Sequence, residues 1–140
     1  MIILSSDHAG FELKNYLVNY LKTNNIDFVD VGPTAYEKTD SYVDYTKKAC
    51  KTFTENDKII LCCGSGVGVS IVANRHKGVR AVLGYSKEIV EKAVQHNNAN
   101  CLCMGQNFIG KRKAVNLLKT FLNAKFEGGR HLKRVQSIDN

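Results

Sequence analysis

A glycine-rich segment, Gly-Ser-Gly-Val-Gly at residues 64–68, directly follows the apolar run 58–63. When a strand enters closely spaced glycines and then a helix, free backbone N–H groups and the positive helix end face an anion. The third glycine comes one residue too early for a dinucleotide fingerprint, and no Gly-Lys-Ser/Thr follows to make a P-loop. The segment therefore predicts an anion site of another kind, and the alternative is a tight turn that binds nothing.

A cysteine ends the run that leads into these glycines. We expect the Cys63 thiol to lie beside N–H dipoles, which favour the thiolate. Such a thiolate could act as a nucleophile or abstract a proton, whereas many buried cysteines are inert. Its neighbour Cys62 should point to the opposite face of the strand and is interpreted as a small core residue.

Histidines stand next to two of the expected strands. His8 follows the first strand, and His96 with Asn97 precedes the last one. Imidazole changes charge near neutral pH, so both could move protons, although a lone histidine is more often a surface residue. Asp7 could fix an imidazole tautomer or cap the first helix, and both interpretations remain open.

Positive charge is concentrated near the C-terminus. Residues 1–100 carry 12 basic and 11 acidic side chains, whereas residues 101–140 carry 8 basic and 2 acidic ones. The overall formal charge of +7 suggests an anionic partner such as phosphate or nucleic acid. If the tail is helical, Arg130 and Arg134 lie four apart on one face and could clamp a phosphate. A solvated basic terminus is the alternative.

Short apolar runs alternate with longer amphipathic segments, the pattern of strand and helix units in a parallel sheet. Strands are expected at 2–4, 26–31, 58–63, 79–83 and 101–104, and helices at 11–22, 42–53, 67–75, 87–95 and 111–124. We expect one α/β domain over 1–140, a three-layer Rossmann-like fold with a five-stranded parallel sheet. Ligands of such sheets bind beyond the carboxyl ends of the strands, so the segment containing His96 would have to fold back to reach them.

The cysteine pattern and the hydropathy bear on the compartment. Five cysteines, with one adjacent pair and one Cys-x-Cys, match neither a disulfide framework nor a zinc site. No apolar stretch approaches the roughly 20 residues of a membrane span. We expect a cytoplasmic protein with reduced thiols, no metal site and no membrane partner.

Five motifs in this order resemble those of the ribose-5-phosphate isomerase B family, which includes galactose-6-phosphate isomerase subunits and allose-6-phosphate isomerases. The motifs lie at 6–11, 62–74, 78–81, 95–97 and 127–134. The resemblance implies an aldose/ketose isomerase that needs no cofactor and acts on a small sugar phosphate. It also implies a homodimer or a dimer of dimers, in which the neighbouring subunit completes each site, with residues from about 126 to 140 contributing phosphate ligands.

The resemblance also implies roles for residues at matching positions. Cys63 would move a proton between C2 and C1 through a cis-enediolate, and Ser65 would relay a proton between the two oxygens. Backbone N–H groups of Gly64, Gly66 and Gly68 would stabilise the enediolate. His96, assisted by Asp7, would open the sugar ring. The residues implied to hold phosphate or sugar are His8, Tyr42, Asn97, Arg130 and Arg134.

The substrate expected from these positions is ribose 5-phosphate, interconverted with ribulose 5-phosphate. One chain carries every implied residue, which favours a homomer acting on a pentose phosphate. A 6-phosphohexose isomerase, a phosphosugar-binding module without catalysis and a nucleic-acid-binding protein are the alternatives. Two positions depart from the family pattern: Gln106-Asn107 replaces an arginine that many members carry, and Val43 replaces a proline after the tyrosine.

Overall fold

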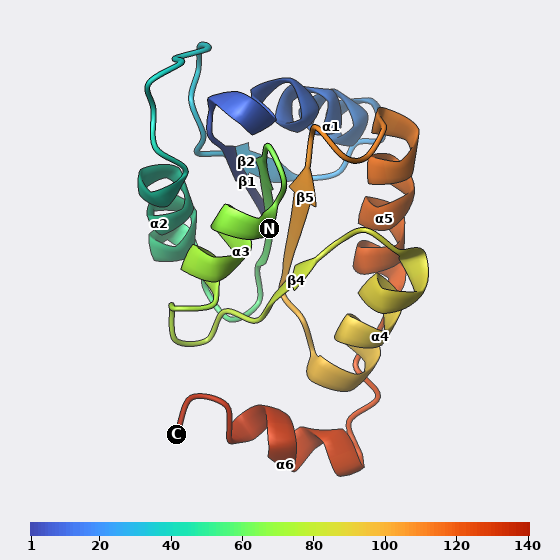
Figure 1. The fold of residues 1–140 in the computed structure, drawn as a ribbon. Coiled ribbons are helices and arrows are strands. Elements are labelled where there is room, and N and C mark those ends of the chain that lie inside the picture. The colour runs from blue at the N-terminus through green and yellow to red at the C-terminus, as the bar shows by residue number, and fades with distance from the viewer.

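The computed structural model describes residues 1–140 and contains a five-stranded, fully parallel sheet in the order β2-β1-β3-β5-β4 (Figure 1). The strands are β1 (Ile2–Ser6), β2 (Phe28–Asp30), β3 (Lys58–Cys63), β4 (Ala81–Leu83) and β5 (Cys101–Gly105). The helices are η1 (His8–Gly10), α1 (Phe11–Thr23), α2 (Tyr42–Thr52), α3 (Val67–Ala73), α4 (Lys87–Asn97), α5 (Lys111–Asn123) and α6 (Arg130–Gln136). The α/β fold class expected from the sequence is confirmed.

Alternating side chains of the central strand β3 enter two separate cores. Ile60 and Cys62 belong to the larger core, under α1, α4 and α5. Ile59, Leu61 and Cys63 belong to the smaller core, under α2 and α3. Figure 1 shows these two helix layers on opposite faces of the sheet. The period of two along a strand thus directs Cys63 to the face under the glycine-rich segment, as the sequence predicts.

The two edge strands are shorter than their apolar runs. β2 pairs only with β1 and β4 only with β5, so each keeps three paired residues. Ile26 instead donates its N–H to the Leu21 carbonyl at the end of α1, 3.0 Å away, and does not enter the sheet. α4, in contrast, continues through His96 and Asn97, which were expected in a polar loop.

The carboxyl edge of the sheet is closely packed around η1. A Cβ built on Gly10 would lie 2.3 Å from the carbonyl carbon of Cys62, so only glycine allows η1 to pack directly on β3. The Gln106 side chain, which follows β5, accepts the N–H of Leu13 in the first turn of α1 at 2.9 Å. The loops after β1, β3 and β5 are therefore held together.

None of the helices has the length and the apolar character that a membrane-spanning helix needs.

A buried lysine ties α1 to the end of β2. The Lys14 side chain is 1% exposed, and its Nζ lies 2.7 Å from Asp30 Oδ2 and donates to the Pro33 carbonyl at 3.2 Å. Its Nζ also lies 5.1 Å from the centroid of the Phe11 ring. Lys14 therefore holds the end of β2 and the residues that follow it, up to Pro33, against α1.

Replacing Lys14 should destabilise the protein. We expect Lys14→Ala to lower the free energy of unfolding by about 3 kcal/mol, because the Pro33 carbonyl and Asp30 lose their partner and the stem leaves a cavity. Lys14→Met, which keeps the side-chain volume, should cost less. Urea denaturation at one protein concentration measures both, with the exposed Lys22→Ala as control. Equal stability of Lys14→Ala and wild type would contradict this assignment.

Candidate active site

The glycine-rich loop closes around the Cys63 sulfur. The Gly66 N–H donates to Cys63 Sγ at 3.1 Å, and the Val67 N–H donates to Ser65 Oγ at 3.2 Å. Gly66 has φ +80°, and a Cβ on it would lie 2.8 Å from Leu83 Cδ1 and 2.9 Å from the Met104 carbonyl carbon. Only glycine fits this turn. The hydrogen bond from Gly66 holds the Cys63 sulfur against the loop.

Residues after β4 and β5 hold the same loop from its other side. The Gln106 and Asn107 N–H groups donate to the Cys63 and Gly64 carbonyls at 2.9 and 3.0 Å. The Tyr85 hydroxyl donates to the Ser65 carbonyl. Sequence reasoning missed the contribution of Tyr85, because nothing in its local spacing indicates a partner 20 residues away. The loop N–H groups are thus fixed before any ligand binds.

Tyr42, the first residue of α2, lies against the same loop. A Cβ built on Gly68 would be 2.8 Å from Tyr42 Cε2, so the ring covers the first turn of α3. Ser41 caps α2 by accepting the Val43 N–H at 3.2 Å. This cap sets where α2 begins. Tyr42 therefore packs against the glycine-rich loop at Gly68.

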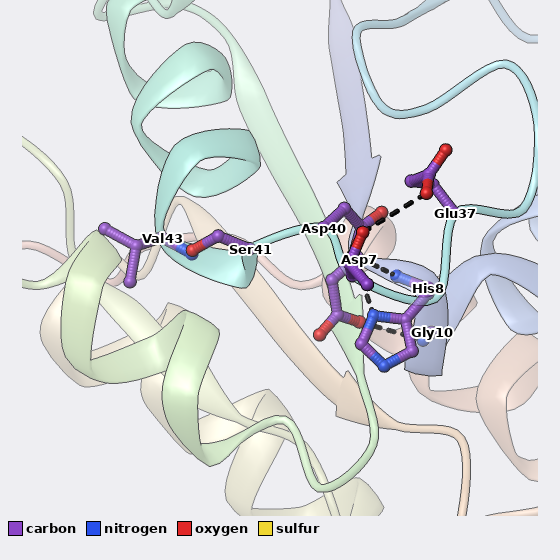
Figure 2. Close-up of polar contacts among 8 residues, drawn as sticks. Asp7, His8, Gly10, Glu37, Asp40, Ser41 and Val43 are labelled. Atoms are coloured by element: carbon purple, nitrogen blue, oxygen red, sulfur yellow. Dashed lines mark hydrogen bonds and ion pairs between the residues drawn. The ribbon is translucent and has the colours of Figure 1, made fainter.

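Asp7 and His8 stand at the end of β1, and the structure decides which interpretation of Asp7 is correct. The Asp7 carboxylate is buried and caps η1 by accepting the Gly10 N–H at 3.0 Å. Burial raises the pKa of Asp7, and the Gly10 hydrogen bond opposes that rise. The carboxylate that holds the His8 ring is instead Asp40, whose Oδ1 lies 2.8 Å from His8 Nδ1 (Figure 2). Sequence reasoning missed Asp40, which is 32 residues away.

A second group of polar residues gathers where α4 ends and α6 begins. The His96 and His131 rings stack with centroids 4.3 Å apart and planes at 11°, and His96 Nε2 lies 3.4 Å from Glu127 Oε1. A cavity of about 430 Å³ is lined by His96, Asn97, Arg130, His131, Arg134, Val135 and Ile138. Partial burial, then the neighbouring His96 and Arg130, lower the pKa of His131. The tail is helical here, and both arginines line one cavity.

Within one chain the two groups lie at opposite ends of the sheet. The carboxyl-edge set, which follows strands β1 and β3, comprises Asp7, His8, Tyr42, Gly64, Cys63, Ser65, Gly66 and Gly68. The amino-edge set comprises His96, Asn97, Arg130 and Arg134. Because His96 comes before β5 and Cys63 comes at the end of β3, a strand length of about 16 Å separates them. The segment with His96 does not fold back to the carboxyl edge, since it forms the last turn of α4.

Two clusters offer three potential metal ligands each, with donor atoms within 4.8 Å of one another. In the cluster of His96, Glu127 and His131, the imidazole planes are nearly parallel, so their lone pairs do not converge on one point. In the cluster of Asp7, His8 and Asp40, one Asp40 oxygen already accepts two hydrogen bonds. The His96 cluster therefore lacks the converging ligands of a preformed zinc site, and in the Asp7 cluster His8 already engages an Asp40 oxygen.

The fold and the carboxyl-edge set define a Rossmann-like α/β protein with a hydrogen-bonded thiol in a glycine-rich turn that leads into a helix. This combination suits an isomerase that moves protons on an anionic substrate. The chain belongs to the Ribose/Galactose Isomerase family, whose model matches residues 2–138. The family resemblance seen in the sequence is thereby confirmed.

Relatives and solved structures agree with this membership. The chain is 37% identical to ribose-5-phosphate isomerase B of Escherichia coli, covering 98% of this chain and 93% of the relative. It superposes on ribose 5-phosphate isomerase B of Thermotoga maritima with a TM-score of 0.93 at 43% identity, over 99% and 96% of the two chains. The TM-score is also 0.93, at 39% identity, for the Mycoplasma genitalium enzyme with bound ribulose-5-phosphate, over 98% and 92% of the chains.

Proposed function

We propose that this protein is a ribose-5-phosphate isomerase that interconverts ribose 5-phosphate and ribulose 5-phosphate. The observation that carries the proposal is the Cys63 thiol, which accepts the Gly66 N–H at 3.1 Å inside the glycine-rich loop. Relatives of this chain carry that name, and one solved relative holds ribulose-5-phosphate. A protein that only bound the sugar phosphate would need no base in this position.

The carboxyl-edge set supplies the proton transfers. In the open-chain aldose, the Cys63 thiolate removes the proton on C2, and the electron pair moves through C1 onto the carbonyl oxygen to form a cis-enediolate. Cys63 then returns the proton to C1, while Ser65 moves a proton from O2 to O1. In this proposal the backbone N–H groups of Gly64 and Gly68 stabilise the developing oxyanion, and Gly66, whose N–H holds the Cys63 sulfur, shapes the loop between them. One oxyanion donor contributes about 3 to 4 kcal/mol in comparable sites.

The amino-edge set of a second copy supplies ring opening and phosphate binding in this proposal. His96 exchanges protons with the ring oxygen and the C1 hydroxyl, and Asp7 of the carboxyl-edge set assists it. Arg130 and Arg134 grip the phosphate together with His8, and Asn97 lines the sugar site beside Tyr42. We therefore propose a homodimer or a dimer of dimers, with the domain 1–140 requiring no cofactor.

A coupled assay tests the proposed function. Purified protein is offered ribose 5-phosphate, allose 6-phosphate and galactose 6-phosphate, and formation of the matching ketose is followed. We expect turnover of ribose 5-phosphate with the highest kcat/KM. Preference for a hexose phosphate would contradict the proposed substrate but support the proposed type of reaction. Turnover of none of the three sugar phosphates would contradict the proposed isomerase activity.

Arg134 provides a prediction about phosphate binding. Arg134→Ala should raise the KM for ribose 5-phosphate about tenfold and change kcat by less than about threefold, because a phosphate contact far from C2 contributes equally to ground and transition states. Steady-state kinetics measure the split. Lys133→Ala, an exposed neighbour of equal charge on α6, is the control. A large fall in kcat with unchanged KM would show that Arg134 does more than grip phosphate.

A further inference from the structure

We propose that Asp40 is a positioning residue that orients the His8 imidazole, so that His8 donates to Asp40 from Nδ1 and to a bound phosphate group from Nε2. The inference rests on the proposed function, in which His8 is a phosphate ligand. It adds a residue that acts only through His8 and comes from the segment between β2 and α2.

One oxygen of Asp40 holds His8 at two points. The backbone N–H of His8 donates to Asp40 Oδ1 at 2.9 Å, and the Nδ1 of its ring lies 2.8 Å from the same oxygen. These two contacts fix the ring relative to its own backbone. The edge of the Tyr36 ring packs against the imidazole, with centroids 6.0 Å apart and planes at 88°. Figure 2 shows the edge of the His8 ring that carries Nε2 turned away from Asp40.

The Asp40 carboxylate depends on this contact for its charge compensation. Its side chain is only 6% exposed, whereas that of His8 is 30% exposed. Its second oxygen, Oδ2, is buried and has no hydrogen-bond partner. A buried carboxylate is costly unless it is paired and hydrogen bonded. Asp7 offers a further donor atom within 4.8 Å of this pair, and the Tyr36 ring packs against the imidazole. The His8 ring is the one basic group that forms an ion pair with Asp40.

The number of N–H groups on the imidazole decides whether His8 can donate to both Asp40 and a phosphate group. A neutral imidazole has one N–H, and the contact with Asp40 places it on Nδ1, leaving a lone pair on Nε2. A lone pair repels a phosphate oxygen. The imidazolium has two N–H groups, so one satisfies Asp40 and the other donates to phosphate with a full positive charge behind it. The pair of carboxylate and imidazolium is therefore the state that fits both the buried Asp40 and an anionic ligand.

The experiment uses Asp40→Asn in the full-length protein, with inorganic phosphate as the probe. The amide oxygen of asparagine can still accept the His8 N–H groups, so the variant removes the charge and keeps the shape. We expect the inhibition constant of inorganic phosphate and the KM for ribose 5-phosphate to rise about tenfold, with kcat changed less than about threefold. Glu37→Gln removes an exposed carboxylate from the same segment and should leave all three unchanged.

A double-mutant cycle tests whether Asp40 acts through His8. His8→Gln alone should weaken phosphate binding at least as much as Asp40→Asn, and the double variant should bind no more weakly than His8→Gln. A structural role of Asp40 would add to the His8 effect instead. Additive losses of phosphate affinity would therefore overturn the proposal.

Nitrogen-15 NMR of the wild-type imidazoles provides a readout that needs neither turnover nor a variant. At neutral pH, with phosphate bound, both His8 nitrogens should give the shifts of protonated imidazolium. A neutral His8 with a lone pair on Nε2 would overturn the proposal, even if the protein proved to be an isomerase. Conversely, absence of isomerase activity together with a protonated His8 that binds phosphate through Asp40 would overturn only the proposed function.

Discussion

Cys63→Ala is expected to lower kcat for ribose 5-phosphate about a thousandfold, the middle of the range that a positioned acid or base contributes. The KM should stay within about threefold, because the phosphate contacts are untouched. The physical reason lies in the geometry: the C2 proton is weakly acidic, and Cys63 is the one thiol that accepts a loop N–H. Single-substrate kinetics with the purified variant measure the loss.

The adjacent cysteine provides a matched control for this experiment. Cys62 faces the larger core on the other side of the sheet and is fully buried. Burial raises the pKa of Cys62 far above its ordinary value, so it remains a protonated thiol. Cys62→Ala should lose some stability and keep its turnover. Wild-type turnover by Cys63→Ala, or equal loss by the two variants, would contradict the assignment of Cys63 as the base.

Mixing two inactive variants should restore activity. One variant is Cys63→Ala, which damages the carboxyl-edge set, and the other is His96→Gln combined with Arg134→Ala, which damages the amino-edge set. In a mixed dimer, one site pairs an intact carboxyl edge with an intact amino edge. Random exchange of subunits makes half of the dimers mixed, with one working site of two, so about one quarter of the wild-type activity should return.

The measurement is kcat/KM at low substrate concentration after the two variants have exchanged subunits. Each variant carried through the same exchange alone is the control and should remain inactive. No recovery in the mixture, with exchange shown by a mass difference between the subunits, would mean that each chain builds its own site. The separation of the two sets by a strand length within one chain is the reason to expect recovery.

The local sequence predicted most of the fold. The apolar runs and helical periodicities located every strand and the main helices, because a parallel sheet buried on both faces needs continuous apolar strands. The predicted bounds of the two edge strands were too long, because β2 and β4 each pair with only one neighbouring strand. The predicted end of α4 was also wrong, because α4 continues through His96 until Asn98 adopts φ +50° and ends the helix.

Some features of the candidate site could likewise be predicted from the local sequence, and others could not. Residue type and local spacing determined the glycine-rich turn, the cysteine that enters it and the paired arginines of α6, since these features depend on neighbours within four residues. Only the tertiary structure decided that Asp40 holds His8, that Tyr85 anchors the Ser65 carbonyl and that His96 lies at the end of the sheet opposite Cys63. Those relations join residues 20 to 33 positions apart, and they depend on how the strands are ordered and how the loops pack over their ends.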